Sequence, residues 1–195
     1  MTKERDKSLI TPETLVEIQR FSQEQREALE KEGYATYELT GQSIKSLREQ
    51  GNPFWSSWHE GYPKLEALIS RRSEVAINPK QLFIPGSNHR TFLEQQAMVK
   101  RFSKDISTRI PGVEAVLGEI PDYAELVFLS PAEQRLFGEK YNYNYTRTKT
   151  RIVSDVADVG DFRPVRGLRV CRWLPDIRDV NLFAAPLVVP ISGTK

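Results

Sequence analysis

The spacing of apolar positions in the first two thirds of the chain is typical of helices. In segment 11–33 the apolar residues form one narrow stripe, Thr11 can cap the first turn, and Gly33 can end the helix. Shorter helices are expected over 40–51 and after Pro63. We expect the apolar stripe to pack against its own domain, the alternative being a partner helix.

The strongest helical pattern covers residues 91–109, where Thr91 and Glu94 have the spacing of a capping box. A shorter helix is expected over 130–138, with Ser130 as its cap. In the long helix, the spacing predicts one face buried in the main core, made of Phe92, Val99, Phe102 and Ile106.

Runs of β-forming residues between the helices predict short strands at 74–77, 81–84, 113–119 and 123–129. After Gly138 the hydrophobic period changes to two. The runs that follow are separated by segments rich in Gly, Pro, Asp and Asn, which predicts an antiparallel meander with strands at 141–150, 152–159, 167–173 and 182–189.

These elements predict an α+β fold, in which N-terminal helices pack against a mostly antiparallel C-terminal β-sheet. We expect a flexible tail over residues 1–10, a helical N-terminal region over 11–70, and an α+β domain over 71–195 that ends in the meander.

Charge is unevenly distributed, although the net charge of this chain of 195 residues is only +2. Residues 1–60 contain 8 Lys and Arg against 11 Asp and Glu, whereas residues 135–195 contain 11 against 6. The basic end therefore favours an anionic ligand or partner more strongly than the net charge does.

Several chemistries lack their sequence signals. Cys171 is the only cysteine, so no disulfide can form within the chain, and two histidines with one cysteine do not supply a Cys/His zinc site. Phosphate-loop, dinucleotide-binding and nucleophile-elbow motifs are absent. We expect no metal, no cofactor, no signal peptide and no membrane span, and a cytoplasmic protein or, alternatively, a phage particle component.

The candidate binding residues come from the segment 141–150, in which tyrosines and basic residues alternate with Asn and Thr. In a strand this alternation places Tyr and basic side chains on one face, where they suit a planar or anionic ligand. In the alternative, the tyrosine face packs against a helix and the Thr face is exposed. Together with the arginines of the next strands, the predicted site comprises Tyr143, Tyr145, Arg147, Lys149, Arg169, Arg172 and Trp173.

Three functions follow from these residues. The first is a non-catalytic binding protein that presents this surface to a protein, a glycan or an anionic ligand. The second is a nucleic-acid-binding accessory protein that uses the same residues. The third is an enzyme centred on His59 and Glu60, which lie side by side in an aromatic loop and could act as acid and base.

The segment GLRVCRW, residues 167–173, is followed by a short loop and a terminal strand. Over about thirty residues, this arrangement resembles the closing strands of C-type-lectin-like domains, such as those of formylglycine-generating enzymes and of retroelement variable proteins. The resemblance implies a ligand-binding sheet whose loops carry specificity, and no active-site residue of those families is carried over. More broadly, the chain resembles bacterial or phage proteins.

Overall fold

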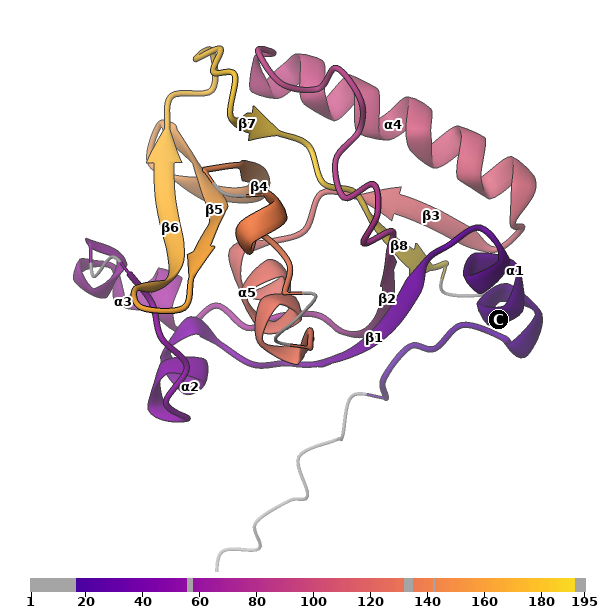
Figure 1. Cartoon of the computed structure of the whole chain (residues 1–195), viewed down its shortest axis with the longest axis horizontal. Coiled ribbons are helices and arrows are strands. Elements are labelled where there is room, and N and C mark those ends of the chain that lie inside the picture. The colour runs from indigo at the N-terminus through magenta and orange to yellow at the C-terminus, as the bar shows by residue number, and fades with distance from the viewer. Residues whose placement is uncertain (1–16, 56–57, 132–134, 142, 192–195) are drawn as a thin grey trace, which may run out of the picture.

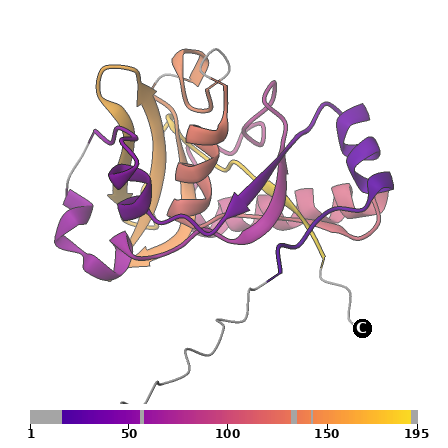
Figure 2. The ribbon, with the colours of Figure 1, turned by 90° about the horizontal axis from the view of Figure 1, so that it is seen from below.

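The computed structural model describes residues 17–55, 58–131, 135–141 and 143–191. These residues form five α-helices and eight strands, and the strands are arranged in two four-stranded sheets (Figure 1). The predicted α+β fold class is therefore confirmed. The long helix α4 runs along one side of the molecule, and α5 lies between the two sheets (Figures 1 and 2).

The first sheet draws its strands from both ends of the described chain. Its order is β1-β2-β8-β3, and every pairing in it is antiparallel. Its strands are far apart in the sequence: β1 is Ala35–Thr40, β2 is Arg72–Ile77, β3 is Val113–Val116 and β8 is Leu187–Pro190.

The second sheet contains the predicted meander, in the order β6-β5-β4-β7. Strands β4, Tyr145–Ile152, β5, Asp155–Arg163, and β6, Gly167–Trp173, are antiparallel neighbours. The predicted fourth strand over 182–189 is wrong in one respect: it divides into β7, Leu182–Phe183, parallel to β4, and β8 in the first sheet. The division falls before Pro186, which has no backbone N–H for a ladder.

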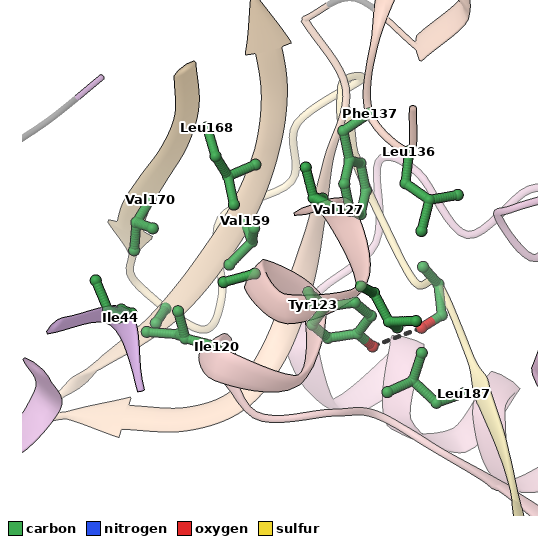
Figure 3. Packing of buried hydrophobic residues seen from close by; sticks show 14 of the residues in the cluster. Ile44, Ile120, Tyr123, Val127, Leu136, Phe137, Val159, Leu168, Val170 and Leu187 are labelled. Atoms are coloured by element: carbon green, nitrogen blue, oxygen red, sulfur yellow. Dashed lines mark hydrogen bonds between the residues drawn. The ribbon is translucent and has the colours of Figure 1, made fainter. Parts of the chain in front are cut away.

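Helix α5, Ile120–Leu129, is the centre of the core and is buried on almost every side. Pro121 occupies its first turn, and Thr150 Oγ1 accepts the Ile120 amide at 3.0 Å. The Tyr123 hydroxyl donates to the Ala185 carbonyl at 2.6 Å, which ties the helix to the segment between β7 and β8 (Figure 3). The strand predicted at 123–129 is thus wrong: a short, mainly apolar run fits a fully buried helix as well as a strand.

Helix α4, Phe92–Arg109, begins where the sequence predicts. Thr91 and Glu94 form the expected capping box. The hydrogen bond from the Thr91 amide, followed by those from the Arg178 side chain and the Thr91 hydroxyl, lowers the pKa of Glu94 to about 2. Three of the four predicted face residues are buried, but not in the main core: Phe92 and Val99 belong to one smaller cluster and Ile106 to another. Phe102 is only partly buried, because it faces a cavity of about 250 Å³.

The N-terminal helices are shorter than predicted. Helix α1, Gln23–Lys31, is capped by Ser22 in a capping box with Gln25, and Thr11 lies outside the described residues. Helix α2, Ile44–Glu49, is capped by Ser43 rather than Thr40, since residues 35–40 form β1. The predicted helical region therefore also contains a strand.

The remaining predicted elements are short or absent. Helix α3, Pro63–Glu66, follows the 3₁₀ helix η1, Trp58–Gly61, and agrees with the helix expected after Pro63. Residues 81–84 form no strand. Of the helix expected over 130–138, residues 132–134 lie outside the described chain and residues 135–138 form a turn.

Candidate binding surface

Strand β4 is not the exposed platform that its alternation predicts. Its threonine face lies in the core: Thr146 Oγ1 accepts the Ala185 amide at 2.9 Å, and Thr148 Oγ1 donates to the Ala157 carbonyl at 2.8 Å. The alternative with an exposed threonine face is therefore also wrong. Threonine hydroxyls here supply hydrogen-bond partners to buried backbone groups, which explains polar residues at core positions.

Arg147 is fully buried on the opposite face of β4. Its guanidinium donates to the carbonyls of Leu174, Pro175 and Ile177 at 3.4, 3.1 and 2.5 Å. Arg147 therefore holds the loop between β6 and β7 against the sheet. Its assignment to a ligand surface is corrected by this burial, since a guanidinium that is enclosed and bonded to carbonyls is not available to a ligand.

Three other predicted site residues lie apart from one another. Lys149 is exposed within the stretch where the register between β4 and β5 is irregular. Arg172 lies near the rings of Trp58 and Tyr62 and donates to the Tyr62 hydroxyl at 3.0 Å. Trp173 is 38% exposed at the end of β6. Among the described residues, no contact joins these three side chains into one surface.

The structure does bring Tyr143, Tyr145 and Arg169 together, around a tryptophan from the other end of the sequence. Trp55 has three guanidinium groups over its ring, those of Arg163, Arg166 and Arg169, at 5.0, 4.6 and 4.9 Å from the ring centroid. The Arg163 guanidinium also lies 4.3 Å from the ring centroid of Tyr143. We call the set the aromatic–arginine cluster; it consists of Trp55, Tyr143, Tyr145, Arg163, Arg166 and Arg169.

The backbone places Trp55 beside the sheet through an added pairing at its edge. The Leu168 amide donates to the Pro53 carbonyl at 3.0 Å, and the Trp55 amide donates to the Leu168 carbonyl at 2.9 Å. Gly167 makes this approach possible, because its φ is 85° and a Cβ there would lie 2.1 Å from the Pro53 oxygen. Residues 53–55 thereby continue the sheet beyond β6.

Asp161 organises the tyrosine side of the cluster. This buried carboxylate accepts the Tyr143 amide at 3.2 Å, the Tyr145 hydroxyl at 3.3 Å, and two N–H groups of Arg163 at 3.1 and 3.3 Å. The Tyr145 hydroxyl in turn accepts from Arg169 at 3.0 Å. Burial raises the pKa of Tyr145, so its phenol stays neutral and its hydroxyl can both donate and accept.

The cluster has an excess of positive charge. Asp161 pairs with Arg163, whereas Arg166 and Arg169 have no carboxylate partner within 4 Å among the described residues. Cation–π contacts with Trp55 hold these guanidinium groups near one another despite their repulsion. The arrangement leaves N–H donors for an external anion.

Few features of the sequence indicate this grouping. Trp55 lies more than 100 residues from the arginines, and it belongs to a loop that shows no periodicity. Arg163 and Arg166 belong to the arginine-rich C-terminal part, but they lie in a predicted loop between two strands, where the alternation of a strand does not predict the direction of a side chain. Only Gly167, between Arg166 and Leu168, indicates a close backbone approach, and glycine alone does not identify the partner.

The His59 site differs from its predicted form. His59 is fully buried, and its Nδ1 contacts Glu66 rather than Glu60. Glu66 also accepts from Arg48 at 2.6 Å, and the exposed Glu60 accepts from the same guanidinium at 2.7 Å. His59 Nε2 has no hydrogen-bond partner among the described residues. The structure therefore pairs His59 with Glu66 and not with Glu60, and the hypothesis of an enzyme centred on His59 and Glu60 stays a prediction.

Two further observations concern the described residues only. They contain no group of three or more His, Cys, Asp and Glu side chains arranged to hold a metal ion. None of their helices is long and apolar enough to cross a membrane.

Comparison of this chain with protein-family models, with curated proteins and with solved structures finds no match. The C-type-lectin-like resemblance of the C-terminal strands therefore stays a prediction.

Proposed function

We propose that the protein is a non-catalytic binding protein, and that its aromatic–arginine cluster binds an anionic group of a ligand or partner. The observation that carries this proposal is the placement of three guanidinium groups over the single indole of Trp55, two of them without a carboxylate partner among the described residues. The fold holds these positive charges close together although they repel one another. Such a concentration of positive charge favours the binding of an anion.

The chemistry of arginine supports the same function. A guanidinium presents several N–H donors in a fixed plane, so it can bind a carboxylate or phosphate through two parallel hydrogen bonds. Stacking on Trp55 restricts Arg166 and Arg169 before any ligand arrives. Less side-chain entropy is then lost on binding.

The enzyme hypothesis has weaker support. His59 is enclosed by the protein, and its carboxylate neighbour Glu66 is already bound to Arg48. A general acid or base has to come within hydrogen-bond distance of a substrate. An enclosed imidazole fits a structural role in the packing of the loop around Phe54 and Trp58.

The proposal is tested by retention on a heparin column, with the full chain and a salt gradient. The double variant Arg166→Gln/Arg169→Gln loses two positive charges from the cluster. Its matched control, Lys100→Gln/Arg101→Gln, loses two from the exposed surface of α4. We expect the cluster variant to elute at clearly lower salt than the control. Equal elution of the two variants would overturn the proposal, because it would show that only net charge matters.

A further inference from the structure

We infer that the partner of the aromatic–arginine cluster is an acidic protein segment, whose carboxylates bind Arg166 and Arg169 and whose apolar side chain covers Val165. This inference rests on the proposed function and names the partner class of the same surface. Three features of the cluster favour a polypeptide over a nucleic acid: its composition, the occupation of its aromatic rings, and its small extent.

The composition is that of a protein-binding surface with an apolar contact. Tryptophan, tyrosine and arginine are the residues most enriched among the energetically dominant positions of protein interfaces. Val165, at the tip of the hairpin between β5 and β6, is 95% exposed and precedes Arg166. A protein segment can cover this valine with an apolar side chain, which a sugar–phosphate backbone does not provide.

The aromatic rings are already covered by guanidinium groups. Proteins that bind single strands without sequence preference stack bases on aromatic rings. Here Arg166 and Arg169 lie over Trp55, and Arg163 lies over the ring of Tyr143. A base would have to displace these groups, whereas a carboxylate binds the outward N–H edges and leaves the stacking intact.

The basic surface is also compact. Binding of single strands uses a positive groove that follows the backbone over roughly four nucleotides or more. The guanidinium groups of Arg166 and Arg169 both lie within 5.0 Å of one ring centroid. Neighbouring arginines do not extend the track, since Arg147 is buried and Arg172, unlike Arg166 and Arg169, already has a carboxylate partner, Asp155 at 3.7 Å. On an extended segment, carboxylates two residues apart are separated by about 7 Å along the chain. This separation suits two guanidinium groups that lie over the same ring.

The test begins with a random 12-residue peptide library displayed on phage and selected on the immobilised full chain. We expect the enriched peptides to be acidic and to contain a large apolar residue. Selection on Arg166→Gln/Arg169→Gln should lose them, and selection on Lys100→Gln/Arg101→Gln should retain them. Circular dichroism of each variant checks that it is folded.

The most enriched peptide is then synthesised with a fluorescent label and titrated alongside a labelled 12-residue oligothymidylate. We expect the peptide to bind at least 10-fold more weakly to Arg166→Gln/Arg169→Gln, and several-fold more weakly to Val165→Ser. If the oligothymidylate binds more tightly than the peptide, and Arg166→Gln/Arg169→Gln loses this binding, the inference of an acidic segment is overturned and the proposed function is upheld. Enriched peptides that are not acidic, or that bind the cluster variant equally, would also overturn the inference. If heparin elution is unchanged as well, the proposed function fails with it.

Discussion

The carboxylate of Asp161 accepts the backbone amide of Tyr143 at 3.2 Å, and both residues have positive φ angles, 48° and 65°. The left-handed region costs a non-glycine residue about 1–2 kcal/mol. Two such residues in contact, at the edge of the proposed binding surface, show that surrounding interactions fix this backbone. Strained residues of this kind are often found at functional sites.

The first prediction concerns Asp161. Replacement by Ala leaves Tyr143 N–H, the Tyr145 hydroxyl and Arg163 without their common acceptor. We expect a loss of about 2–4 kcal/mol in the free energy of unfolding, because the partly buried Tyr143 N–H and Tyr145 hydroxyl each lose an acceptor. Asp161→Asn keeps the shape and one acceptor oxygen and tolerates positive φ, so it should lose only about 1 kcal/mol. Urea denaturation measures both, and an Ala variant as stable as the Asn variant would contradict this role.

The second prediction concerns the central helix. The Tyr123 hydroxyl donates to the Ala185 carbonyl at 2.6 Å and accepts the Gly118 amide at 3.0 Å. Tyr123→Phe should lower the free energy of unfolding by about 1–3 kcal/mol, since two buried backbone groups lose their partner. Tyr37→Phe is the matched control, because the Tyr37 hydroxyl has no hydrogen bond to the described residues. Equal stabilities of the two variants in urea denaturation would show that Tyr123 acts only through its ring.

The third prediction concerns Asp158, which is buried in register with Arg147 and Cys171. Neither carboxylate oxygen has a hydrogen-bond partner among the described residues. Burial raises the pKa of Asp158 well above its usual range, against the opposing effects of Arg147, of Arg169 and of the nearby Trp173 side chain. The native state therefore holds the proton to higher pH than the unfolded state does, and this group's contribution to stability falls as pH rises from about 4 through the raised pKa.

Asp158→Asn removes the titrating carboxyl group and nearly keeps the shape of the side chain. We expect the variant to gain stability relative to the wild type as pH rises, by about 1.4 kcal/mol for each unit by which the native pKa is raised. Urea denaturation at several pH values between 4 and 8 measures the difference. A variant that loses stability relative to the wild type with rising pH would show an ionised Asp158 paired with Arg147.

The fourth prediction concerns Cys171, whose side chain lies in the same cross-strand row. Burial, followed by the charge of Asp158, raises the pKa of the Cys171 thiol to about 11. Because the pKa lies about two units above its ordinary value, the fraction of thiolate at pH 8 is about 100-fold lower than for an unperturbed thiol. Only the thiolate reacts readily. Iodoacetamide should therefore alkylate the native protein at least about 100-fold more slowly than the urea-unfolded chain. Comparable rates would show that the thiol is neither enclosed nor shifted.

The parts of the fold that the sequence could predict are those with local signals. Helix α4 has its capping box and its apolar face within one segment, and β6 has Gly167 at its start. Helix α5 has almost no exposed face, because both sheets cover it and even Asp122 and Glu125 are buried, so the sequence shows no separate polar side from which a helix could be recognised. Phe102 had the right spacing, but a cavity beside it is a property of the assembled fold.

The candidate site shows the same division. Tyr143, Tyr145 and Arg169 were predicted from local composition, and the structure brings them together through Asp161. Trp55 was not predicted, because its contact with the arginines depends on a pairing between residues 53–55 and β6. Arg147 was assigned to the surface by alternation alone. The loop that covers it lies about thirty residues further along the chain.

The last prediction concerns the turn between β4 and β5. Ile152 and Asp155 are register partners, so the hairpin loop consists of Val153 and Ser154. Val153 has a φ of 56° and is 95% exposed, and Ser154 is not among the residues with positive φ. Positive φ at the first loop position alone is typical of a type II′ turn, which favours glycine there. A β-branched residue in this conformation is strained, and its exposed side chain gains little from packing.

Val153→Gly should therefore raise the free energy of unfolding by about 0.5–1 kcal/mol. Relief of about 1–2 kcal/mol of backbone strain is partly offset by the greater freedom of glycine in the unfolded chain. Ser154→Gly is the matched control: it adds the same freedom where no positive φ has to be relieved, and it should lower stability by about 0.5–1 kcal/mol. Urea denaturation of both variants decides the matter. If Val153→Gly is destabilising to the same extent as Ser154→Gly, the turn is not strained at Val153.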